Sequence, residues 1–264
     1  MTDAASLPCS DACPAEVHLG DCLDVLDRIA TPAEGFRLVY LDPPFNTGRT
    51  HRASNGRFED TWPDIPAYLE WLRLRVSRAI DCMHEDGVIL LHCDWRTCHH
   101  LRLMLDDLLG PERFVNHLIW QYGLGGSSPR RFARKHDDIL FYARSDGYCF
   151  EPPRVEATSE RLRGQFKKAT DVLDVPAINN MASERVGWPT QKPLALLELL
   201  IGACCPPDGA VLDPCCGSGT TLVAARRLGR ASVGIDRSEQ AVAIARQRLA
   251  DIAPASGDGT PVMA

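Results

Sequence analysis

Residues 210–221 read AVLDPCCGSGTT, an apolar run that ends in an acid and continues into a glycine-rich turn. The run predicts a buried strand, and the residues from Thr220 onward have the apolar spacing of a helix. A glycine turn at such a junction lets the backbone approach a ligand at the carboxyl end of the strand. The next predicted strand, residues 230–236, ends in Asp236, whose carboxylate can accept hydrogen bonds from a ribose diol. Together these features predict a site for an adenosine-containing cofactor.

The glycine turn alone does not separate a dinucleotide from S-adenosylmethionine. A complete GxGxxG pattern is absent, because Leu222 stands where the third glycine would fall. A tight strand–helix turn without a ligand is the structural alternative, but the agreement of Asp213, the two glycines and Asp236 argues against it.

The rest of the chain alternates strand and helix patterns. Strands are expected at 16–20, 36–42, 87–94, 114–122 and 137–144, and helices at 22–30, 65–83, 95–109, 192–204 and 238–252, the last capped by Ser238. This alternation predicts an α/β fold, a doubly wound and mostly parallel sheet with helices on both faces.

Length and composition agree with one large α/β domain. The chain has 264 residues, 45% of them hydrophobic, and no apolar run near the roughly 20 residues that a membrane helix needs. The first residues carry no basic, apolar export signal, so we expect a cytoplasmic protein with reduced cysteines. We expect no metal, since the 11 cysteines lack zinc-site spacing and the group His92, Cys93, Cys98, His99 and His100 is better explained by buried thiols and surface histidines.

The stretch LVYLDPPFN, residues 38–46, carries the chemistry. A buried strand ends in Asp42, and Pro43 and Pro44 remove two backbone donors, so the groups that remain are acceptors. Such acceptors can hold both hydrogens of an aromatic amine while Phe45 stacks on the ring. They favour a pyramidal nitrogen with its lone pair aimed at a methyl donor, and Asp42 can take the released proton. A proline-rich turn with a solvated acid is the alternative.

These motifs together resemble the amino-group DNA methyltransferases that use S-adenosylmethionine. The order LVYLDPPFNTG, then PTQKPLALLELL, then VLDPCCGSGTT with GID is similar to the circularly permuted beta class, and the resemblance covers most of residues 16–250. Two positions depart from the usual pattern. Cys215 and Cys216 replace a phenylalanine and a small residue, and Phe45 replaces the commoner tyrosine, which keeps stacking but loses a hydroxyl.

The resemblance implies a role for each matching residue. It makes Asp42, Pro43, Pro44 and Phe45 the catalytic tetrad that grips the amine. It assigns cofactor binding to Asp21 near the adenine, Lys192 near the carboxylate, Asp236 at the ribose and Asp213. The residues implied at the methionine end are Gly217, Ser218, Gly219, Thr220 and Thr221. Within the family an acidic first residue goes mostly with adenine-N6 and a serine with cytosine-N4, so Asp42 favours adenine.

The expected partner is double-stranded DNA, from which the target base must flip to reach Asp42. Net charge is −6, but residues 121–168 hold ten Lys and Arg against six Asp and Glu. The candidates for backbone contacts are Arg130, Arg131, Arg134, Lys135, Arg161, Arg163, Lys167 and Lys168. Residues 46–62 are expected to be a long mobile loop that closes over the flipped base.

The predicted organisation has five parts. Residues 1–15 form a flexible arm, 16–149 the catalytic half, 150–189 a small target-recognition region, 190–252 the cofactor-binding half and 253–264 a disordered tail. Because the recognition region is short, a homodimer or a partner subunit is considered.

Other functions compete with DNA adenine methylation. Cytosine-N4 methylation is the first, and a methyltransferase for RNA or protein is the second. An inactive subunit of a modification complex is the third, although no motif looks damaged. A nicotinamide dehydrogenase is the least favoured, since nothing in it requires Asp42-Pro43-Pro44-Phe45.

Overall fold

A computed structural model describes residues 13–123, 127–157, 160–179 and 182–252, and its centre is an eight-stranded sheet. The strand order is β1 (Ala15–Leu19), β12 (Ala231–Asp236), β11 (Ala210–Asp213), β2 (Phe36–Leu41), β5 (Met83–Cys93), β7 (His136–Ala143), β6 (Phe114–Gln121) and β10 (Val172–Asp174). All neighbours pair in parallel except β7, which is antiparallel to β5 and β6. The predicted doubly wound, mostly parallel fold is confirmed.

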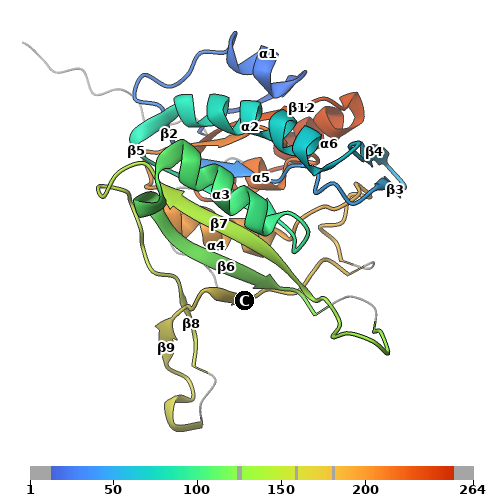
Figure 1. Cartoon of the computed structure of the whole chain (residues 1–264). Coiled ribbons are helices and arrows are strands. Elements are labelled where there is room, and N and C mark those ends of the chain that lie inside the picture. Colours follow the sequence, from blue (N-terminus) through green and yellow to red (C-terminus); the bar gives the residue numbers. More distant parts are fainter. Residues whose placement is uncertain (1–12, 124–126, 158–159, 180–181, 253–264) are drawn as a thin grey trace, which may run out of the picture.

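Helices cover both faces of this sheet (Figure 1). They are α1 (Cys22–Leu26), α2 (Ile65–Asp81), α3 (Cys98–Leu109), α4 (Leu194–Cys204), α5 (Thr220–Arg227) and α6 (Glu239–Ala250). Side chains alternate across the central strands. Val39 and Leu41 of β2 join the core under α2 and α3, whereas Leu38 and Tyr40 join the core under α4. The continuous apolar run of β2 is therefore explained by burial on both faces.

The helix ends follow the local sequence. Asp64 caps α2 by accepting a hydrogen bond from the Ala67 amide at 2.8 Å, and Ser238 caps α6 by accepting from the Ala241 amide at 3.3 Å. The cap at Ser238 is as predicted. The helix expected at 22–30 is shorter, because α1 ends at Leu26 and the chain turns there.

Residues 46–62, expected to be a long loop, instead hold an antiparallel hairpin of β3 (Arg49–Ala53) and β4 (Gly56–Asp60). That expectation was wrong. The pair Asn55-Gly56 is a strong hairpin signal, and it lies between two runs with alternating exposure. The polar composition of the segment obscured this pattern.

The segment 150–189 forms a small two-stranded arm and one strand of the main sheet. β8 (Arg154–Glu156) and β9 (Phe166–Lys168) pair as a small arm, with the 3-10 turn η2 (Glu160–Leu162) between them, and another 3-10 turn, η1 (Pro111–Arg113), precedes β6. β10 joins the main sheet beside β6. The division at 150 and 189 stays a prediction. The terminal segments 1–12 and 253–264 lie outside the described residues.

Across the described part of the chain, no helix has the length and apolarity to cross a membrane.

Gly219 allows α6 to pack against the start of α5. Its φ is +77°, and an added Cβ would lie 2.7 Å from the Cβ of Ala245 in α6. Both facts require glycine, since the conformation is left-handed and the space is filled.

We expect Gly219→Ala to destabilise the fold more than Gly229→Ala. Gly229 has a similar φ of +71° with no atom within 4 Å of an added Cβ, so its variant isolates the backbone cost of about 1–2 kcal/mol. Overpacking against α6 should add roughly 1–3 kcal/mol at Gly219. Urea unfolding measures both. Equal losses would show that contact with Ala245 contributes nothing.

Candidate active site

A cavity of about 800 Å³ opens where β11, β2 and β12 end. It brings together twelve of the predicted site residues, which are Asp21, Asp42, Pro43, Pro44, Phe45, Lys192, Asp213, Gly217, Ser218, Thr220, Thr221 and Asp236. Gly219 is not in the lining and packs toward α6 instead. The volume is typical of a small-molecule or cofactor site.

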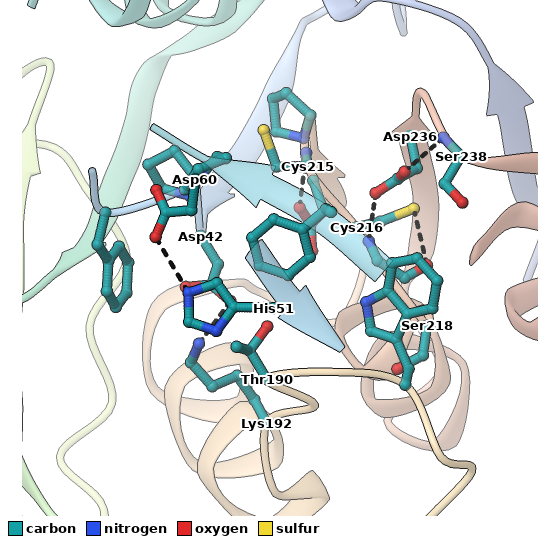
Figure 2. A pocket seen from close by; sticks show the side chains of 18 of the residues that line it. Asp42, His51, Asp60, Thr190, Lys192, Cys215, Cys216, Ser218, Asp236 and Ser238 are labelled. Atoms are coloured by element: carbon teal, nitrogen blue, oxygen red, sulfur yellow. Dashed lines mark hydrogen bonds and ion pairs between the residues drawn. The ribbon is translucent and has the colours of Figure 1, made fainter. Parts of the chain in front are cut away.

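The glycine turn is held in shape by Asp236. Its carboxylate accepts hydrogen bonds from the Gly217 amide at 2.9 Å and from the Ser238 amide at 2.8 Å. Burial raises the pKa of Asp236, and these amide hydrogen bonds oppose the rise. The turn at Gly217 and the acid at the end of the next strand are thus one unit (Figure 2).

Asp21 is held by Arg75, a residue that the sequence did not single out. Arg75 donates to the Asp21 carboxylate at 2.5 Å and lies over the Trp71 ring at 4.3 Å. Burial disfavours the charge of Asp21, but hydrogen bonds from Arg75 and the Leu23 amide outweigh it and lower its pKa. Trp71 and Arg75 also line the cavity.

The Asp42 carboxylate is paired with Lys192, whose Nζ lies 2.6 Å from Oδ2 (Figure 2). Lys192 also sits 5.4 Å from the centre of the Phe45 ring. The resemblance placed Lys192 beside the carboxylate of the cofactor. The structure places it against Asp42, across 150 residues of sequence.

A buried polar chain lies behind the motif and was missed from the sequence. His92, expected to be a surface histidine, is instead fully buried on β5, and it contacts the Tyr40 hydroxyl at 2.8 Å and Asp137 at 3.3 Å. Its ring stacks on Phe45 with centroids 5.7 Å apart. Burial tends to raise the pKa of Asp137. The contacts of this carboxylate with His92 have the larger effect, so the pKa of Asp137 is lowered. These residues come from different strands, so no local pattern could group them.

The Pro44 carbonyl, in the stretch Asp42-Pro43-Pro44-Phe45, accepts a hydrogen bond from within the protein. The Tyr68 hydroxyl donates to the Pro44 carbonyl at 2.9 Å, which ties the turn to α2. Tyr68 is fully buried, and this contact fixes the turn against the core.

The β3–β4 hairpin forms one wall of the cavity and is joined to the segment before Lys192. Asn55 donates to the Val186 carbonyl at 2.7 Å from its side chain and to the Gly187 carbonyl at 2.9 Å from its amide. The Trp188 ring fills the space at Gly56, where an added Cβ would lie 2.1 Å away. Trp188 also lines the cavity beside Gly217, a role that sequence reasoning missed.

At the base of the hairpin, Asp60 organises the chain after the tetrad. Its carboxylate accepts hydrogen bonds from the Asn46 amide at 2.6 Å and the Thr47 amide at 3.1 Å. It also contacts His51 at 3.2 Å (Figure 2). Asn46 takes a left-handed φ of 57°, which asparagine tolerates, so the chain can turn sharply from Phe45 into the hairpin.

The eight predicted basic contacts fall into two separate groups. Arg130, Arg131, Arg134 and Lys135 lie between β6 and β7, and Arg161, Arg163, Lys167 and Lys168 lie on the β8–β9 arm. All eight are exposed. Figure 1 shows the β8–β9 arm and the β6–β7 connection extending from different sides of the molecule.

Within the described residues, one group has the donor atoms to hold a metal, and it shares only Cys98 with the histidine–cysteine group that was considered and rejected as a metal site on sequence grounds. Cys98, His117 and Asp138 have donor atoms within 4.8 Å of one another. His117 is hydrogen-bonded to Asp138 at 2.7 Å, a sufficient structural role. The absence of a metal stays a prediction. Every cysteine in the described ranges is a free thiol.

Comparison with known proteins decides the family. Residues 36–247 match the model of the N6/N4 DNA methylases, described as DNA methylase. The chain belongs to this family. It is a DNA amino-methyltransferase, and S-adenosylmethionine is the methyl donor of the family. The motifs that carried the resemblance all lie in or beside the matched range.

Individual relatives agree with this assignment. The type II methyltransferase M.ScaI of Streptomyces caespitosus is 29% identical over 255 residues, which covers 88% of this chain and 80% of M.ScaI. The type II methyltransferase M.EcaI of Enterobacter cloacae is 25% identical and covers 85% and 67%.

Solved structures share the fold. The M1.HpyAVI–SAM complex has a TM-score of 0.65 at 20% identity, covering 89% of this chain and 98% of that one. The cytosine-N4-specific PvuII DNA methyltransferase has a TM-score of 0.67 at 16% identity, covering 91% and 89%.

The buried carboxyl group of Asp213 makes the free energy of unfolding depend on pH. Its carboxyl is 2% exposed, and burial raises its pKa to about 7, against hydrogen bonds from Thr221 and the Cys215 amide. Between its ordinary value of 3.8 and about 7 the folded state binds a proton that the unfolded state releases. The free energy of unfolding therefore falls as pH rises through this range.

We expect Asp213→Asn to remove this slope. Relative to the wild type, the variant should gain up to about 4 kcal/mol in unfolding free energy between pH 4 and pH 8. Urea unfolding across that range measures it. Asp208→Asn, at an exposed carboxyl just before β11, is the control and should leave the slope unchanged. A constant difference between Asp213→Asn and the wild type would contradict the pKa shift.

Proposed function

We propose that this DNA amino-methyltransferase acts on the exocyclic N6 amine of adenine in double-stranded DNA. The observation that carries the proposal is that one cavity holds both the Asp42 turn and the glycine turn. A group that grips an amine and a group that binds a methyl donor therefore meet in one space, as direct transfer requires.

The cavity residues fit S-adenosylmethionine. Asp236 and Asp21 supply carboxylates for hydroxyl and amine donors, and Trp71 and Trp188 supply aromatic walls. Asp236 is already aligned by the Gly217 and Ser238 amides. When bound, the cofactor supplies a methyl group on a positively charged sulfur. Asp21, Asp236 and Gly217 would hold it, and neither a covalent enzyme intermediate nor a metal is required.

Asp42 and the carbonyl of Pro43 are the acceptors for the two hydrogens of the amine. Lys192 now holds one oxygen of Asp42, so the lysine positions this carboxylate and offsets its charge until the amine arrives. Asp42 then accepts the proton that leaves the nitrogen. Phe45, supported from behind by His92, provides the face on which the base stacks.

Adenine is favoured over cytosine by the carboxylate at position 42, which the family resemblance links to N6 methylation. The target base must leave the duplex to reach this depth. Residues of the hairpin line the cavity, and the exposed arginines between β6 and β7 are available to contact the DNA backbone.

The decisive experiment identifies the product. Purified protein is incubated with methyl-labelled S-adenosylmethionine and unmethylated bacterial genomic DNA, and the nucleosides are separated by mass spectrometry. We expect labelled N6-methyladenine. N4-methylcytosine as the sole product would overturn the choice of base, and label in RNA or protein alone would overturn DNA as the substrate.

Asp42 and Asp236 should separate transfer from cofactor binding. Asp42→Ala should lower methyl transfer at least 10³-fold, since it removes both the amine acceptor and the proton acceptor, while cofactor affinity changes little.

The matched variant Asp236→Ala should instead weaken cofactor binding, by about tenfold or more, because it removes a charge-assisted acceptor and loosens the glycine turn. Titration calorimetry with the cofactor and the labelled-methyl assay measure the two effects. Near wild-type transfer by Asp42→Ala would refute its role.

A further inference from the structure

Phe132 is the most exposed large hydrophobic residue in the described part of the chain. Its side chain is 97% exposed, whereas the next, Leu103 on α3, is 66% exposed. Single exposed apolar residues are common, but a whole phenylalanine ring in water is not a neutral placement. It stands in the sequence SPRRFARK, between Arg130, Arg131, Arg134 and Lys135.

The chain around Phe132 is anchored at its base. Lys135 donates to the Gly123 carbonyl at 2.8 Å, and the Tyr122 amide donates to the Lys135 carbonyl at 3.1 Å. The Arg134 guanidinium stacks on the Trp95 ring at 3.4 Å. These contacts anchor the segment at Arg134 and Lys135, while Phe132 stays exposed to solvent.

This segment rises directly from the wall of the methyl-transfer cavity. The strands that lead into and out of it carry Trp120 and Asp137, and Tyr122 follows β6; all three line the cavity with Asp42. Figure 1 shows the segment and the β3–β4 hairpin extending on the same side of the molecule. A nucleic acid whose base enters the cavity therefore passes the base of this segment, where Trp120, Tyr122 and Asp137 line the cavity.

We propose that Phe132 is a wedge that enters the DNA duplex and fills the gap left by the flipped base, while the arginines around it hold the flanking phosphates. The chemistry fits, since an apolar ring can replace lost base stacking and cations neutralise the backbone on either side. This inference rests on the proposed action on duplex DNA. It gives Phe132 a role in holding the base stack open, separate from the residues that hold the target amine.

The test compares duplex with heat-denatured genomic DNA, using the initial rate of methyl transfer from labelled S-adenosylmethionine. Phe132→Ala should lower the rate on duplex DNA by roughly 10- to 100-fold, because unstacking is no longer offset. On denatured DNA the rate should change less than about twofold, since no stack has to be opened. Phe132→Trp should retain duplex activity, and Leu103→Ala, on an exposed helix position, should behave as wild type.

A second measurement does not depend on turnover. The five native tryptophans give the background, which is measured in wild-type protein. Beyond that background, duplex DNA should protect the added indole of Phe132→Trp from acrylamide quenching, and it should not protect that of Leu103→Trp. If wild-type protein labels DNA but Phe132→Ala matches it on duplex and the indole stays accessible, the wedge is refuted. An equal loss on duplex and denatured DNA would also refute it in favour of a simple strand contact. If wild-type protein labels no DNA, the proposed function itself fails.

Discussion

Three neighbouring parallel strands each lead to a carboxylate at the same edge of the sheet, and the site depends on how these charges are accommodated. Asp213 ends β11, Asp236 ends β12, and Asp42 follows β2. Buried like charges on neighbouring strands repel one another, so each carboxylate must be paired with a cation, hydrogen-bonded or protonated. Asp42 is paired with Lys192, Asp236 is held by backbone amides, and burial raises the pKa of Asp213 to about 7.

The groups that stabilise Asp236 and Asp42 also connect different parts of the cavity wall. One of the two amides that hold Asp236 is that of Gly217 in the glycine turn, so ordering the acid and shaping the turn are one event. The lysine that holds Asp42 belongs to a segment that Asn55 and Trp188 join to the hairpin. Movement of the hairpin would therefore change the surroundings of both Asp42 and the glycine turn, since these contacts connect the three parts.

Much of the fold can be predicted from the sequence because parallel sheets bury both faces of their strands. The continuous apolar runs of β2 and β11, and the helical spacing after each, predicted both the elements and the edge where the site lies. Polar, partly exposed segments were less readable. The β3–β4 hairpin has the composition of a loop, because its alternation is mainly between half-exposed and exposed residues and little apolar area is buried. β10 is only three residues long and is specified by its pairing with β6, not by its own sequence.

The sequence by itself determined the motifs whose chemistry is local: an acid and two prolines at the end of a strand, a glycine turn entering a helix, and an acid at the end of the next strand. Each acts through the backbone conformation of adjacent residues, so its meaning survives without the fold. Only the tertiary structure decided which residues support them. Lys192 against Asp42, Arg75 against Asp21, His92 behind Phe45 and Trp188 against Gly56 all join distant parts of the chain. Such contacts arise from sheet order and packing, which no local spacing encodes.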